Sequence, residues 1–146
     1  PSTSRYCSTR ALIAGEAYGL RSPVTVASPT FYAALQLAAA AELALPDEHA
    51  ERALYVVSGE VECAGQRLEE GDLAVARPGS RVRVTAADGG ARLMLLGGAT
   101  LAGERHIFWN FVSTSEARIE QAKQAWREQR FPRVPSDAVE FTPLPE

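Results

Sequence analysis

The chain has 146 residues, a formal net charge of −3 and a sequence pI of about 5.5, which suits one acidic domain of ordinary size. Its hydrophobic content of 46% and charged content of 23% are typical of a soluble globular protein. The acidic balance argues against direct nucleic-acid binding, and we interpret Arg77, Arg81 and Arg83 as a solvated strand face. No apolar run is long enough for a membrane span, and two cysteines are too few for a disulfide framework. We therefore expect a cytoplasmic protein without membrane contacts.

The first two thirds of the chain predict short strands separated by glycine-containing turns. Residues 22–26 and 31–37 are expected to be strands, and the second of them alternates apolar with more polar positions. The alanine-rich residues 38–45 are interpreted as a turn followed by a strand. Further runs rich in valine and leucine lie at 53–57, 73–75, 82–85 and 91–96. Short strands at this spacing predict an antiparallel sandwich or barrel.

A helix is expected in the C-terminal part of the chain. Ser113 to Glu116 has the pattern of a capping box, in which the serine accepts an early helical N–H and the glutamate reaches back. We expect this helix to end before Phe131 and to pack on the outside of the barrel through Trp126 and Phe131, with a partner protein as the alternative surface. Trp109 and Phe111 are interpreted as core and barrel-closing residues rather than as an aromatic binding platform.

The segment from Pro46 to Arg83 resembles the two motifs of metal-binding cupins in its framework residues but lacks their ligands. The first cupin motif contains two histidines, a glutamate and a glycine. When Gly59 is aligned with that glycine, Arg52 falls where the glutamate would lie. His49 is one residue out of register with the histidine positions, and a slip of one residue turns a side chain to the other face of a strand.

The second cupin motif is also present without its ligand. After Pro78–Gly79 the position of the expected histidine holds Val82 or Arg83. A guanidinium at Arg52 would repel a divalent cation and has no lone pair to donate to it. We therefore predict no metal ligand and no catalytic residue in this chain.

Further segments together are similar to the C-terminal half of a bacterial pirin, a protein with two cupin barrels. These segments are 14–24, 49–59, 105–112, 116–123, 131–132 and 141–145, and the resemblance covers about residues 11–146. It implies a mainly β cupin fold, a jelly-roll barrel with one C-terminal helix packed on the outside. The implied organisation is a divergent segment 1–10, a barrel 11–112, a helix 113–131 and an extended tail 132–146.

The resemblance also implies where the chemistry of the family resides. In pirins the N-terminal cupin holds iron through histidines and a glutamate, and the C-terminal cupin is without metal. Pirins are known as quercetin 2,3-dioxygenase-like enzymes or as redox-sensitive regulators, and both roles belong to the N-terminal half. We thus expect no cofactor in this chain. Residues 1–10 do not match the family, which indicates a truncated or rearranged gene product or a cut between domains.

Three functions stay open from the sequence. The first is a non-catalytic interaction domain that packs against a second cupin barrel or another protein, with a homodimer as a further possibility. The second is a small-molecule binder in which Arg52 holds a carboxylate beside Tyr55 or Asn110, although such an arginine is more often paired with an acid such as Glu51 or Glu60. The third is a metal-dependent dioxygenase.

Overall fold

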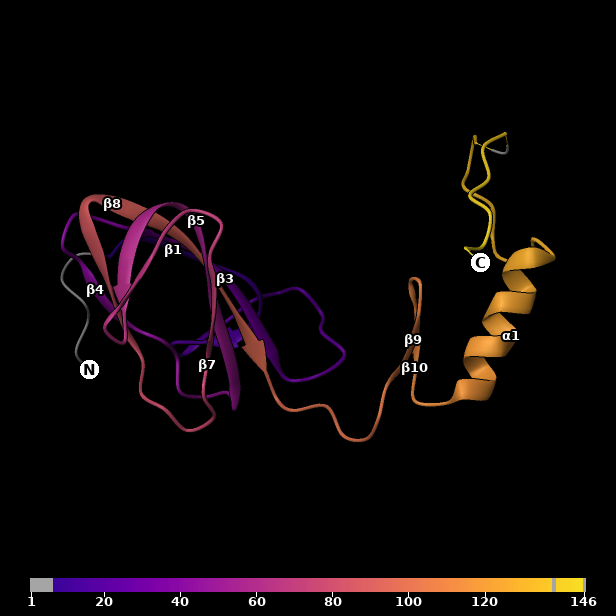
Figure 1. Ribbon diagram of the computed structural model, residues 1–146, viewed down its shortest axis with the longest axis horizontal. Helices are drawn as coiled ribbons and strands as arrows, with labels where there is room; N and C mark the ends of the chain where they lie inside the picture. The colour runs from indigo at the N-terminus through magenta and orange to yellow at the C-terminus, as the bar shows by residue number, and fades with distance from the viewer. Residues whose placement is uncertain (1–6, 138, 146) are drawn as a thin grey trace. The chain divides into compact units, whose positions relative to one another are not determined.

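The computed structural model describes residues 7–137 and 139–145, which belong to two compact units divided after Thr100 (Figure 1). The first unit consists of strands that curl around a common interior, and the second contains a hairpin and a helix. The strands of the first unit are β1 (Cys7–Ala17), β2 (Leu20–Arg21), β3 (Thr30–Leu37), β4 (Glu42–Ala44), β5 (Glu51–Cys63), β6 (Gln66–Leu68), β7 (Leu73–Ala76) and β8 (Arg83–Gly98).

All of these strands belong to one antiparallel sheet with the order β2-β1-β3-β8-β5-β6. Strand β4 also pairs with β8, and β7 also pairs with β5, so each of the two long strands has different partners along its length. Strands that change partners in this way bend around a core. The predicted mainly β fold with one C-terminal helix is confirmed.

The bend in the two long strands depends on glycine. Gly59 in β5 lies opposite Ala91 in β8, between two register shifts of this strand pair. Its φ of 81° is in the left-handed region, and a Cβ there would lie 2.3 Å from the carbonyl oxygen of Gly90. Only glycine fits this combination of backbone conformation and close approach.

The barrel core follows the period of two expected for half-buried strands. In β3 the buried residues are Phe31, Ala33, Leu35 and Leu37, as the alternation in the sequence predicts. They join inward-facing leucines and valines of β4, β5 and β8 in one hydrophobic cluster. The interior of the barrel is therefore filled mainly by aliphatic side chains.

Two sequence expectations for loops and strands have different outcomes. Residues 38–45 form a turn followed by β4, as predicted. Residues 22–26, predicted as a strand, are a loop. The hydroxyl of Ser22 donates to the carbonyl oxygen of Ile13 and accepts from the N–H of Val24, and Pro23 has no N–H to give to a sheet. These local interactions compete with strand pairing.

The second unit contains β9 (His106–Phe108), β10 (Phe111–Ser113) and the helix α1 (Glu116–Arg127). The predicted capping box is wrong, because Ser113 is the last residue of β10 and its hydroxyl accepts from the N–H of Ser115. Ser115 is the N-cap, without a side-chain capping bond. The helix, 12 residues long, is too short to cross a bilayer, and no other helix occurs among the described residues.

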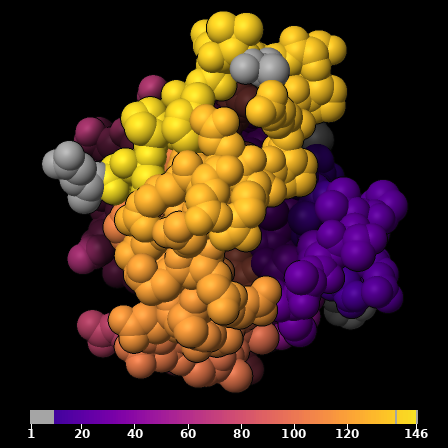
Figure 2. Space-filling view, turned by 90° about the vertical axis from the view of Figure 1, so that its right-hand side faces the viewer, coloured from indigo at the N-terminus to yellow at the C-terminus, as the bar shows by residue number. Residues whose placement is uncertain are grey.

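Aromatic side chains form a cluster of ring contacts in this second unit. Trp126 of α1 contacts the rings of Trp109, Phe111, Phe131 and Phe141, with centroid separations between 5.1 and 6.1 Å. Its indole N–H donates to the carbonyl oxygen of Thr142, so the tail lies against the helix, as the yellow and orange atoms in Figure 2 show. Docking of this helix on the barrel stays a prediction.

The sheet of the first unit ends at Gly98, whereas the sequence resemblance places the barrel at residues 11–112. The hairpin of β9 and β10 pairs only within itself and contacts α1, so it groups with the C-terminal unit. The strands β9 and β10 form a two-stranded sheet of their own among the described residues. A sequence pattern predicts such strands but does not specify which strands they pair with.

Candidate functional site

Arg52, at the position of the cupin glutamate, lies inside the barrel wall. It is 3% exposed and stands in β5 between Ala76 of β7 and Gly97 of β8. Its Nη2 donates to the carbonyl oxygen of Ser80 at 2.7 Å, and its Nη1 donates to that of Pro46 at 3.3 Å. Its Nε is buried and has no hydrogen-bond partner among the residues that the structure describes. A buried guanidinium is thus held by backbone oxygens.

The expected pairing of Arg52 with an acid is wrong. Glu60 forms an ion pair with Arg67 instead, and Glu51 lies on the exposed side of β5. Arg52 is satisfied by carbonyl oxygens because β5 brings it next to two loop segments whose backbone oxygens point inward. Side-chain charge patterns alone do not reveal such acceptors.

The two histidine positions of the first motif hold Pro46 and Glu48, or Leu45 and Asp47, and the Glu48 carboxylate accepts from the N–H of Tyr18 at 2.7 Å. His49 has Nε2 2.7 Å from the carbonyl oxygen of Glu16, and its ring stacks on Phe31. Val82 is apolar, and Arg83 forms an ion pair with Glu42. Within residues 7–137 and 139–145 no three His, Cys, Asp or Glu side chains are grouped so that they could hold a metal ion. The residues at the motif positions therefore do not fit the iron of a catalytic cupin.

Two of the three residues predicted to bind a carboxylate lie on opposite faces of β5. Arg52 points into the barrel, whereas Tyr55, three positions along the same strand, is 38% exposed on the opposite face. Asn110 lies in the turn between β9 and β10, in the second unit. Arg52 and Tyr55 thus do not share a face, and carboxylate binding by this set stays a prediction.

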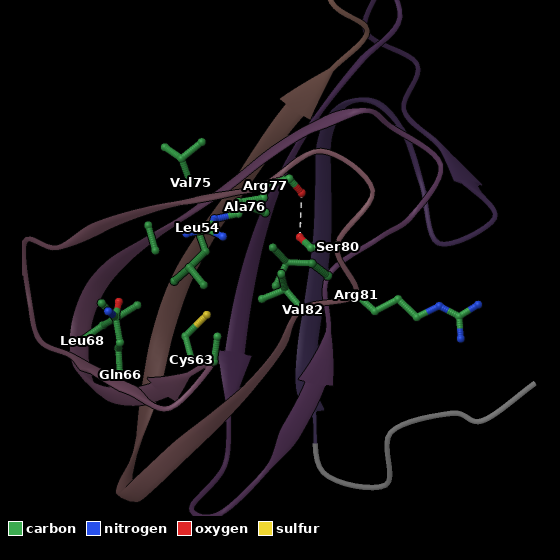
Figure 3. Close-up of a pocket in the computed structure, with 13 residues that line it drawn as sticks. Leu54, Cys63, Gln66, Leu68, Val75, Ala76, Arg77, Ser80, Arg81 and Val82 are labelled. Atoms are coloured by element: carbon green, nitrogen blue, oxygen red, sulfur yellow. Dashed lines mark hydrogen bonds between the residues drawn. The ribbon is translucent and has the colours of Figure 1, made fainter.

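A pocket with a volume of about 420 Å³ opens where β5, β6 and β7 meet the loop 77–82, and we call it the β5–β7 pocket (Figure 3). Leu54, Leu68 and Val82 contribute to its apolar wall, and Cys63 points its sulfur among these side chains. Burial raises the pKa of the Cys63 thiol, so the thiol is neutral near pH 7. The sequence did not indicate this pocket, because residues far apart in the chain form it.

The outer side of the sheet carries two rows of side chains in register across β3, β8, β5 and β7. The first row is Tyr32, Leu96, Ala53 and Val75, and the second row is Ala34, Met94, Tyr55 and Leu73. Residues directly opposite each other on neighbouring strands point to the same side of a sheet. Every member of these rows is aliphatic, methionine or tyrosine, and we call this surface the outer apolar face.

The outer apolar face is open to solvent at its large side chains. Leu73 is 57% and Val75 is 73% exposed, and Tyr32, Tyr55 and Leu96 are also exposed. Next to the second row on the same side of the sheet, Gln36 of β3 lies opposite Arg92 of β8. The surface therefore becomes polar at that edge. Exposed apolar patches with polar rims are typical of sites of interaction.

Comparisons with known proteins agree with this architecture. Residues 32–132 match the family model described as the pirin C-terminal cupin domain. A quercetin 2,3-dioxygenase from Acinetobacter baumannii has a similar fold, with a TM-score of 0.80 over 94% of this chain and 47% of that chain, at 21% identity. At this identity the likeness concerns the fold alone.

Two bacterial relatives are similar in sequence. The chain is 47% identical over 135 residues to a pirin-like protein of Caulobacter vibrioides, a match that covers 92% of this chain and 46% of that protein. It is 36% identical over 135 residues to a Pseudomonas aeruginosa protein whose name gives quercetin 2,3-dioxygenase as its supposed activity, covering 90% of this chain and 42% of that protein. The chain thus spans about half the length of the relatives it matches. On the family match and these identities, it belongs to the pirin family and corresponds to the C-terminal cupin domain of that family.

Proposed function

We propose that this chain is a non-catalytic, metal-free cupin domain that acts by packing against a second cupin barrel. The observation that carries the proposal is the outer apolar face, with its two rows of apolar side chains in register across β3, β8, β5 and β7. Covering a large apolar side chain of this kind contributes about 1 kcal/mol or more to association. A partner that covers both rows would therefore gain several kcal/mol of association free energy, at about 1 kcal/mol for each large side chain.

The choice of a cupin barrel as the partner rests on the length of the relatives. More than half of the Caulobacter and Pseudomonas proteins lies outside the part that this chain matches. In pirins that remaining part is a cupin of similar size, which the resemblance described above gives as the iron-bearing barrel. The apolar side of a sheet, such as the outer apolar face, suits packing against another sheet.

The metal-free character is supported by what occupies the motif positions. The guanidinium of Arg52 fills the place of the ligand glutamate and is held there by the carbonyl oxygens of Ser80 and Pro46. Leu54 and Val56, on the same inward face of β5, are fully buried and apolar. A cation placed among these groups would meet a fixed positive charge and no anionic ligand.

The interaction is tested by sedimentation of this chain with the separately purified N-terminal barrel of the Caulobacter relative. We expect a one-to-one complex that Leu73→Lys/Val75→Lys weakens by at least about tenfold, because two lysines would be buried without partners. The matched control is Leu101→Lys/Val134→Lys, since these residues are 55% and 67% exposed and belong to the second unit, whereas the outer apolar face belongs to the first. Absence of a complex, equal loss in the control, or a homodimer in place of the complex would contradict the proposal.

The absence of catalysis is tested on the chain alone. After incubation with iron, nickel or zinc and gel filtration, elemental analysis should find far less than one metal ion per chain, and the protein should not consume oxygen with a flavonol. A stoichiometric metal with flavonol turnover would instead establish the dioxygenase alternative.

A further inference from the structure

The β5–β7 pocket combines apolar walls with unneutralised positive charge. Its lining contains Arg77 and Arg81 and no acidic residue. Among the described residues neither of these arginines forms an ion pair or a side-chain hydrogen bond. Their sequence neighbour Arg83 is paired with Glu42, so the unpaired arginines of this segment are the two that line the pocket. Arg77, Arg81 and Arg83 are exposed, as expected for a solvated face, but residues 77–82 form a loop and only Arg83 lies on a strand.

A third guanidinium lies beneath the same pocket. Arg52 donates to the carbonyl oxygen of Ser80, and Ser80 is one of the lining residues. Arg52 is almost completely buried and its hydrogen-bond partners are neutral, so its charge is not cancelled locally. Burial reduces the screening of this charge by solvent and ions. Arg52 thus adds a buried positive charge next to a pocket whose lining contains two arginines and no acidic residue.

The remaining polar groups of the lining permit binding of an anion. The Ser80 hydroxyl donates to the carbonyl oxygen of Arg77 and so fixes the loop next to the pocket, as the dashed line in Figure 3 shows. Gln66 offers an amide without a hydrogen-bond partner among the described side chains. The thiol of Cys63, neutral near pH 7, adds no negative charge. Nothing in the lining repels an anion.

From this combination we infer that the β5–β7 pocket binds a small organic anion with an apolar body, such as an aromatic or branched aliphatic carboxylate. The apolar body would lie against Leu54, Leu68 and Val82, and the carboxylate would bind Arg77 with Gln66 as a second donor. The volume of about 420 Å³ is in the range of small-molecule sites, which is about 300–1,000 Å³. The pocket shares Val75 with the outer apolar face, but the anion contacts at Arg77 and Gln66 lie outside that face and do not require packing against a second barrel.

The two rim arginines provide a matched pair for the test. Figure 3 shows Arg77 at the edge of the pocket, whereas the side chain of Arg81 extends away from the other lining side chains. Both are exposed, and neither is engaged in an ion pair among the described residues. Arg77→Gln should therefore weaken binding, while Arg81→Gln removes the same charge from the same loop with little effect.

The experiment titrates the ¹⁵N-labelled chain with 1-naphthoate and follows backbone amide shifts. We expect saturable shifts at Leu54, Leu68 and Val82 with a Kd of about 1 mM or tighter, from the affinity per atom usual for small ligands. Arg77→Gln should raise the Kd by about tenfold and Arg81→Gln by less than about twofold, since one charge-assisted contact is lost only in the first.

The neutral isostere 1-naphthamide separates an anion site from a merely apolar one. For the unchanged chain, the Kd of 1-naphthamide should be about tenfold higher than that of 1-naphthoate. For the chain carrying Arg77→Gln, the two probes should have the same Kd. Absence of saturable shifts, shifts confined to another surface, equal binding of the two probes, or equal effects of the two arginine variants would overturn the assignment.

Discussion

Replacing the buried Arg52 tests whether its guanidinium holds the barrel wall together. Arg52→Ala removes the hydrogen bonds to Ser80 at 2.7 Å and to Pro46 at 3.3 Å. A hydrogen bond from a charged donor contributes about 1.5–3 kcal/mol, and the longer of the two should lie below that range. With the cavity left by the side chain, the free energy of unfolding should fall by about 3 kcal/mol, which is a decrease of about 10 °C in Tm.

Two comparison variants make this prediction specific. Arg92→Ala removes an exposed arginine from β8 and should cost less than about 0.5 kcal/mol. Arg52→Glu, which restores the charge type of a cupin ligand, should be less stable than Arg52→Ala because its carboxylate would face two carbonyl oxygens. The assay is urea unfolding followed by far-UV circular dichroism. A loss below about 1 kcal/mol for Arg52→Ala, or an Arg52→Glu variant that is more stable than Arg52→Ala, would refute the reasoning.

Three further predictions concern the bend at Gly59, the buried thiol of Cys63 and the ring contacts of Trp126. Gly59→Ala should lower stability by about 3 kcal/mol in thermal unfolding, because its Cβ would lie 2.3 Å from a backbone oxygen of β8 at a φ of 81°. Gly65→Ala, at a φ of 78° with open space around it, should cost only about 1 kcal/mol. In a Cys7→Ser background, Cys63 should react with a disulfide reagent at pH 8 at least about tenfold more slowly than a free thiol. Because burial raises the pKa of Cys63, its rate should still be rising with pH where that of the free thiol has levelled off; a rate equal to that of the free thiol would contradict this. Trp126→Ala should destabilise the second unit by about 3 kcal/mol in urea unfolding, and Trp126→Phe by about 1 kcal/mol, because the latter keeps ring contacts and loses only the hydrogen bond to the tail. Equal losses for the two Trp126 variants would contradict this account.

Local patterns were sufficient for the strands whose burial alternates regularly. The alternation at 31–37 predicted both the strand and its buried face, since a period of two follows from the pleat itself. The loop at 22–26 was missed because a serine side chain and a proline compete with strand pairing there. The helix start was misplaced because Ser113 completes a hairpin before the helix begins.

The candidate sites could be predicted only in part, because contacts between segments far apart in the chain form them. Aligning the cupin motif on Gly59 identified Arg52 as the residue in the ligand position, and the structure shows it buried there. The carbonyl oxygens that hold it come from loops whose approach no side-chain pattern specifies. The outer apolar face likewise requires the register of Tyr55 with Met94 and Leu73, residues brought together by pairing across long stretches of chain.

The placement of the tryptophans has a practical consequence for measuring how the two units unfold. Both tryptophans of the chain, Trp109 and Trp126, lie in the second unit, with ring centroids 5.1 Å apart. Intrinsic tryptophan emission therefore originates in the second unit, without any label. Unfolding curves from emission and from the β signal of the barrel coincide only if the two units unfold as one cooperative system. The unmodified protein thus carries its own probe of coupling between the units.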